Sequence, residues 1–142
     1  MPLPSISDAM RKASEPIKMG WSLVELSAIR TLAAKAKDGK PPSTNIFFDF
    51  TIVQGPLNSG DNEGKKVSLM ISAAGLDAGV QETCSTYTAL IASLVNDPAV
   101  SGAPDENALI GKRCWAELSQ RVFDGKTFTD MKVFSPESVL PF

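Results

Sequence analysis

Alternation of side-chain character along residues 109–136 constrains the fold of this chain more than any other feature of its sequence. The first part of this stretch sets small and apolar residues against polar and charged ones, and the apolar set is Cys114, Ala116 and Leu118. A period of two is typical of a strand with one buried face. Asp124-Gly125 follows, a dipeptide that accepts the positive φ values of a tight reversal, and residues 126–134 alternate again before Pro136. The sequence therefore predicts a β-hairpin near the end of the chain.

Three further strands are predicted upstream of this hairpin. Residues 45–56 alternate, with Phe48 and Phe50 assigned to the core and Phe47 to the opposite face. Residues 20–32 fit a strand or a helix by periodicity alone, and we predict a strand because a polar loop joins them to residues 45–56 in the manner of a meander. Residues 65–73 supply the third strand.

The period changes to that of a helix between Gly79 and Asp97, and Pro98 ends the pattern. Cys84 and Tyr87 lie on its apolar side, where we expect both to pack. The predicted order of three strands, one helix and two strands gives a mainly β fold (β+α), a five-stranded OB-like barrel with one helix between strands 3 and 4. Residues 1–19 form an N-terminal arm with a short helix, and residues 20–142 form the OB-like domain.

Length and composition narrow the function classes. The 142 residues suffice for one domain with a hydrophobic core, and 43% hydrophobic with 21% charged residues is ordinary for a globular protein. No apolar run is long enough to span a bilayer and no secretory leader is visible, so we expect a cytoplasmic protein with free thiols at Cys84 and Cys114. The chain has no histidine, no metal-ligand spacing and no nucleophile-base pair. We therefore predict no enzyme activity, no metal and no cofactor.

Charge is unevenly distributed along the chain. The net charge is -2 and the pI is about 5.1, which argues against a nucleic-acid partner. Residues 75–110, however, contain five acidic residues and no Lys or Arg, so the remainder is net basic. Two basic regions result, a loop with Lys35, Lys37 and Lys40 and a group in or beside the final hairpin.

Basic and aromatic side chains mixed on one sheet face suit single-stranded nucleic acid. Trp115 shares its side of the strand with the charged residues Arg113 and Glu117, which favours an exposed stacking position over a core position. Trp21, in contrast, is expected to seal a barrel end. Charge clusters are more often solvated loops than binding sites, but the predicted fold sets the lysine loop beside a binding groove. The predicted nucleic-acid-binding residues are Arg30, Lys35, Lys37, Lys40, Phe47, Arg113, Trp115, Arg121, Phe123, Lys126 and Lys132.

The segments GWSLVELSAI, FFDFTIVQGP, IGKRCWAEL and FDGKTFTDMKVFSP, taken in order, resemble phage single-stranded DNA-binding proteins of the OB-fold type. The resemblance covers most of the chain from Gly20 onward. It implies binding of single-stranded DNA without strong sequence preference, in support of phage DNA replication or recombination in the host cytoplasm. Leu140-Pro141-Phe142 is similar to the Ile-Pro-Phe ending of bacterial single-stranded DNA-binding proteins, which docks replication proteins, although the acidic tail before it is missing here.

A second interpretation belongs to a different class of protein. The low pI also fits a structural or protein-interaction module, such as a phage virion component, because small barrels host many functions. An enzyme ranks below both interpretations. The choice between DNA and RNA and the presence of a homo-oligomer stay open on sequence.

Overall fold

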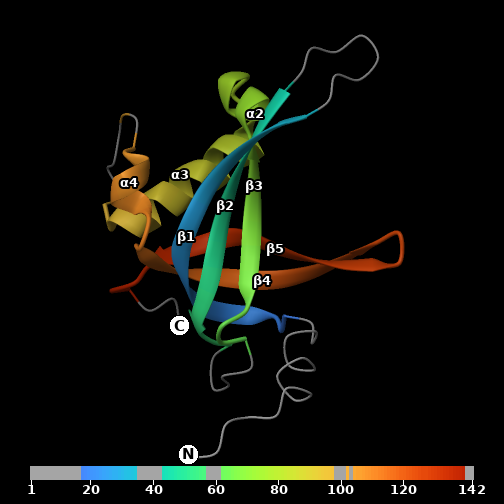
Figure 1. Cartoon of the computed structure of the whole chain (residues 1–142), viewed down its shortest axis with the longest axis vertical. Coiled ribbons are helices and arrows are strands. Elements are labelled where there is room, and N and C mark those ends of the chain that lie inside the picture. The colour runs from blue at the N-terminus through green and yellow to red at the C-terminus, as the bar shows by residue number, and fades with distance from the viewer. Residues whose placement is uncertain (1–16, 35–42, 57–61, 98–101, 103, 140–142) are drawn as a thin grey trace, which may run out of the picture.

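The computed structural model describes residues 17–34, 43–56, 62–97, 102 and 104–139. Within these residues five strands form one antiparallel sheet, accompanied by three helices (Figure 1). The strands are β1 (Gly20–Ala34), β2 (Ser43–Gln54), β3 (Lys66–Ser72), β4 (Arg113–Phe123) and β5 (Lys126–Pro136). The helices are α2 (Ala73–Asp77), α3 (Gln81–Val95) and α4 (Glu106–Leu109). All five predicted strands are confirmed.

The sheet has the strand order β3-β2-β1-β4-β5, so β3 and β5 are its two edges. In Figure 1 the hairpin of β4 and β5 runs across the direction of β1, β2 and β3, so the sheet is strongly coiled. The predicted closure into a barrel is not shown, because no hydrogen-bonded ladder joins β3 to β5 among the described residues. The beginning of α3 borders the space between these edges, where Glu82, Thr83 and Thr86 lie beside residues of both strands. The observed fold is thus a mainly β protein with one open sheet.

The core lies between the inner face of the coiled sheet and helix α3. Leu90, Ile91 and Leu94 of the helix pack there with buried strand residues. These include Phe48 and Phe50, which the sequence assigned to the core. Tyr87 contacts the same cluster, with its ring centroid 6.4 Å from that of Phe48. Burial raises its pKa. Removing side chains of this size from water is the main source of stability in such a domain.

Helices α2 and α4 were not predicted. Each begins with a polar side chain that caps its own first turn: Ser72 Oγ accepts from the Gly75 N–H, and Asp105 Oδ1 accepts from the Asn107 N–H, both at 3.1 Å. Such caps satisfy donors that a helix start leaves unpaired. With five and four residues, both helices are too short to show a helical period.

The hairpin turn is confirmed in detail. Asp124 and Gly125 have φ values of 53° and 73°, the left-handed conformation that a two-residue reversal requires. The turn pairs Phe123 with Lys126 and Arg121 with Phe128, so these four residues share one face of the hairpin.

Three predicted segments lie outside the described residues. The short N-terminal helix and the Leu140-Pro141-Phe142 ending are outside them, as is the loop with Lys35, Lys37 and Lys40. The last residues of the predicted N-terminal arm are described and contact the domain. Gln120 Nε2 donates to the Ile17 carbonyl, and the Asn62 side chain exchanges two hydrogen bonds with the Lys18 backbone.

The structure also bears on the predictions for Trp21, for the two cysteines and for a membrane-spanning segment. Trp21 is half-buried at the start of β1. Both cysteines are free, and burial raises the pKa of Cys114 to about 12. Among the described residues no helix has the length and apolar character needed to cross a membrane.

Candidate nucleic-acid interface

One row of side chains crosses the outer face of β1, β2 and β3. The register pairs Arg30 with Phe47 and Phe47 with Met70, so the three residues are neighbours on the face opposite the core. Met70 is 54% exposed, Phe47 is half-buried, and the Arg30 guanidinium lies 5.1 Å from the centroid of the Phe47 ring. We call this row the sheet face. It offers a cation, an aromatic ring and a soft apolar side chain to solvent.

Asp49 organises the polar side chains beside this row. Arg30 donates to both of its carboxylate oxygens, at 2.5 and 3.0 Å, and Ser68 Oγ donates at 2.6 Å. The hydrogen bond from Arg30 lowers the pKa of Asp49, and the same hydrogen bond raises the pKa of Arg30. The guanidinium is therefore held over the Phe47 ring by its carboxylate partner.

The distal part of the hairpin, residues 119–130, projects from the body of the molecule, and we call it the arm (Figure 1). One face carries Phe123, 66% exposed, beside Lys126 and next to Arg121 and Phe128. The Arg121 guanidinium lies 5.1 Å from the centroid of the Phe128 ring. The arm thus repeats the combination of a cation and an aromatic ring that the sheet face shows.

A groove of about 450 Å³ lies between the two edge strands, and we call it the edge groove. Ser68, Met70 and Ser72 of β3 form one wall, and Phe128, Asp130 and Lys132 of β5 form the other, with Arg121 and the beginning of α3 completing the lining. Because Met70 belongs to the sheet face and Phe128 to the arm, the edge groove joins the two surfaces.

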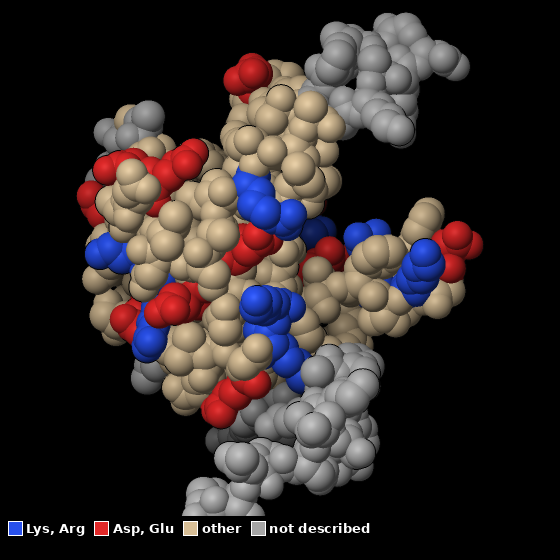
Figure 2. Space-filling view, viewed as in Figure 1, with Lys and Arg blue, Asp and Glu red and all other residues tan. Residues whose placement is uncertain are grey.

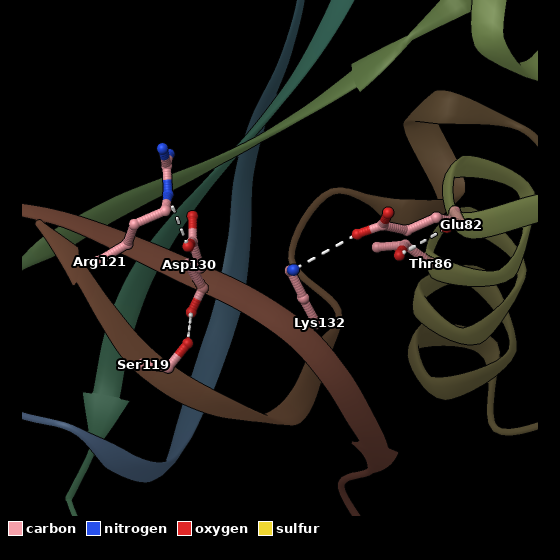
Figure 3. Close-up of polar contacts among 6 residues, drawn as sticks. All are labelled: Glu82, Thr86, Ser119, Arg121, Asp130 and Lys132. Carbon is pink, nitrogen blue, oxygen red and sulfur yellow. Dashed lines mark hydrogen bonds and ion pairs between the residues drawn. The ribbon is translucent and has the colours of Figure 1, made fainter. Parts of the chain in front are cut away.

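Lys132 enters the edge groove because of a β-bulge. The pairing of β4 with β5 shifts between Glu117 and Leu118, whose partners are Val133 and Met131, so Lys132 is the extra residue. Its ammonium group lies 3.3 Å from the Glu82 carboxylate on α3 (Figure 3). Figure 3 also shows Asp130 between Arg121 and Ser119, with Arg121 Nε 3.1 Å from its carboxylate.

The predicted exposure of Trp115 is wrong. The residue is only 5% exposed, and its indole Nε1 donates to the Glu137 carbonyl at 3.2 Å. The turn after β5 covers this face of β4, where Trp115 pairs with Leu23, itself buried. Trp115 therefore packs within the protein and does not lie on an exposed face.

Arg113 lies at the opposite end of β4 from the arm. Its Nε is 3.1 Å from Glu25, and eight residues of strand separate it from Arg121, or about 26 Å at 3.3 Å per residue. The structure therefore places Arg121 and Lys132 in the edge groove, and Met70 connects the groove to Phe47 and Arg30 on the sheet face. Phe123 and Lys126 lie at the tip of the arm, and Arg113 lies apart from all of these. Lys35, Lys37 and Lys40 lie outside the described residues.

Most of the predicted cations that the structure describes have a carboxylate partner. Arg30, Arg113, Arg121 and Lys132 each form an ion pair, and within the described part of the chain Lys126 does not. Figure 2 shows the consequence on this side of the molecule, where Lys and Arg side chains alternate with Asp and Glu side chains around the hollow beside the arm. Exposed pairs of this kind contribute about 0–1 kcal/mol each, so a phosphate can replace the carboxylate at small cost.

Sequence reasoning missed Met70 and Phe128. Phe128 follows Lys126 by two residues in the alternating run after the turn, so its place beside Arg121 was readable from the hairpin register. Met70 belongs to the third predicted strand, but nothing in the sequence indicated that this strand would be an edge strand beside β5.

No protein-family model matches this chain, and a search of curated proteins finds no relative.

Proposed function

We propose that this protein binds single-stranded DNA without strong sequence preference. The observation that carries the proposal is the recurrence of one arrangement on two connected surfaces, with Arg30 at 5.1 Å from the Phe47 ring on the sheet face and Arg121 at 5.1 Å from the Phe128 ring on the arm. Aromatic rings stack on any base, and cations beside them neutralise phosphates. Met70 and Phe123 extend the exposed apolar surface at each end.

The finer fold assignment belongs to the same proposal. Closing the order β3-β2-β1-β4-β5 on itself would join β3 to β5 in a five-stranded barrel with α3 near the seam, so we propose an OB-like barrel that is open at this seam. In such folds a sheet face and two inter-strand loops hold the oligonucleotide. Here those loops are residues 35–42 and the turn at Asp124-Gly125.

The biological role we propose follows from the resemblance to phage single-stranded DNA-binding proteins. Coating of single strands supports phage DNA replication or recombination in the host cytoplasm. Leu140-Pro141-Phe142 is the proposed contact for replication or recombination proteins.

The test is a fluorescence-anisotropy titration of labelled oligothymidine with the intact chain. We expect binding at low salt that weakens steeply as salt is added, because counterions are released when phosphates are neutralised. We also expect an excess of unlabelled duplex to leave the binding in place. Equal competition by duplex and single strand would contradict the proposal.

A substitution of Phe47 tests whether the sheet face binds the oligonucleotide. Phe47→Leu keeps an apolar side chain but removes the ring, and should weaken binding by about 1 kcal/mol or more, near the lower end for base stacking. Ile110→Ala is the control, because it removes a 45% exposed apolar side chain that lies outside the sheet face and the arm.

A structural or protein-interaction module is the second candidate, and the pairing of four predicted cations with carboxylates favours it. The tip of the arm also exposes Val122 and Phe123, by 73% and 66%, a surface that suits a protein contact. Sedimentation analysis separates the two candidates. An assembly that Phe123→Ser dissolves, in a protein that does not bind oligothymidine, would establish the interaction module.

A further inference from the structure

Two cations from different strands line the edge groove. Arg121 of β4 and Lys132 of β5 both border it, each with one carboxylate partner, Asp130 and Glu82 respectively. The side chains in both pairs are accessible to solvent, because Arg121, Lys132 and Glu82 are exposed and Asp130 is half-buried. Within the groove the four charges cancel.

The neighbours of these charges are suited to a nucleotide. Phe128 provides a ring next to the Arg121 guanidinium, and Met70 provides an apolar surface on the opposite wall. Ser68 and Ser72 add hydroxyl groups along β3. A phosphate held by the cations would therefore leave its base or sugar against Phe128 or Met70.

The bulge at Lys132 adds a second, independent observation. Lys132 has no direct partner on β4, since Val133 pairs with Glu117 and Met131 with Leu118. The bulge instead directs the lysine across the groove toward α3, where it reaches Glu82. Bulges that redirect a side chain in this way are common beside binding sites.

We propose that the edge groove is a phosphate-binding subsite of the DNA path, in which Arg121 and Lys132 exchange Asp130 and Glu82 for phosphodiester groups of the single strand. This inference rests on the proposed function and adds a role for the two carboxylates. They hold the cations in place in the free protein and compete with the phosphates during binding. The exchange also accounts for a nucleic-acid site on a chain of net charge -2.

Removing a competing carboxylate should therefore strengthen binding. Glu82→Gln and Asp130→Asn should each raise the affinity for oligothymidine about two- to fivefold, the range expected from breaking one exposed ion pair. Glu25→Gln is the matched control, because it also frees an arginine from an exposed carboxylate, but at the far end of β4. A similar gain with Glu25→Gln would reduce the effect to overall charge and overturn the proposal.

A double-mutant cycle identifies the cation through which Glu82 acts. Lys132→Gln should weaken binding and reduce the slope of log affinity against log salt by about 0.7, the value for one phosphate contact on a single strand. In the Lys132→Gln background, Glu82→Gln should no longer strengthen binding. Persistence of the full gain in that background would overturn the exchange.

An abasic oligonucleotide distinguishes phosphate contacts from base contacts. The gains with Glu82→Gln and Asp130→Asn should remain on the abasic strand, while the loss with Phe47→Leu should disappear there. Gains that require bases would overturn the phosphate assignment. Thermal unfolding of every variant is recorded alongside, because Glu82 lies in the first turn of α3 and stabilises the helix there.

The two proposals can fail separately. If oligothymidine binds and Phe47→Leu weakens it while the groove variants behave like Glu25→Gln, only the edge-groove subsite is overturned. If the intact wild-type protein does not bind oligothymidine at low salt, the proposed function is overturned and the subsite with it.

Discussion

Trp115 and Phe123 lie on the same face of one strand, eight residues apart, yet Trp115 is 5% exposed and Phe123 is 66% exposed. Both are aromatic, and each follows an arginine by two residues on the same face of the strand. The difference comes from what covers them. The turn after β5 packs on Trp115 and accepts its indole hydrogen bond, whereas no described residue covers Phe123 in this way.

The same contrast separates the body of the hairpin from its arm. From Cys114 to Leu118 most residues of β4 are buried, including both neighbours of Trp115. From Ser119 to Phe123 every residue is exposed, although the ladder to β5 continues. Regular pairing is therefore sufficient to maintain a strand, but a second layer is needed to make it part of a core.

The largest expected effect is on stability. Trp115→Ala should lower the free energy of unfolding by about 3–5 kcal/mol, because a large buried ring is lost. Phe123→Ala should change it by no more than about 0.5 kcal/mol, as for an ordinary surface position. Urea unfolding followed by circular dichroism measures both. Equal losses would show that the arm is packed in solution and would remove the contrast.

The next effect is on binding of the oligonucleotide. Here the substitution at Phe123 should have the larger effect and the substitution at Trp115 the smaller. Phe123→Ala should weaken oligothymidine binding by about 1–3 kcal/mol if its ring stacks on a base. Trp115→Phe should leave the affinity unchanged, since the indole lies beneath the turn. Anisotropy titrations of the two variants under one salt condition make the comparison. A loss confined to Trp115→Phe would restore the original sequence prediction.

The smallest effect tests a charged group in the body of the sheet. The hydrogen bond from Arg30 lowers the pKa of Asp49 below its usual 3.8, so its contribution to stability is present above that pH and is lost as the pH falls through the lowered value. Asp49→Asn should therefore cost at most about 1 kcal/mol at pH 7, and the difference from wild type should shrink toward zero as the pH falls below the lowered pKa.

Urea unfolding at several pH values follows this difference, with Ser68→Ala as a control that removes a single donor to the carboxylate. A difference between wild type and Asp49→Asn that does not depend on pH would mean that the Arg30 pair does not contribute to folding.

Part of the candidate site was predictable because it depends on local sequence. The Asp124-Gly125 turn fixes the hairpin register, and the register alone sets Phe123, Lys126, Arg121 and Phe128 on one face. Phe47 and Arg30 follow from the alternation of β1 and β2 in the same way. The error at Trp115 arose because its cover comes from residues more than twenty positions later in the chain.

The edge groove was not predictable by the same reasoning. It needs β3 and β5 to be the two edges of one coiled sheet, and it needs a bulge that turns Lys132 toward Glu82, fifty residues earlier. The residue types along 126–134 do not show where the pairing shifts by one residue. The ion-pair partners of the predicted cations could not be predicted from the sequence either, because each ion pair joins residues of two different helices or strands.

The sequence by itself determined the strands, the long helix, the tight turn and the central aromatic core, because periodicity, capping and turn chemistry act between residues close together in the chain. The tertiary structure alone decided which aromatic rings are exposed, which of the described strands form the edges of the sheet, and which carboxylate pairs with each described cation. A period of two makes both faces of a strand equally available, and only packing from distant residues determines which of them is covered.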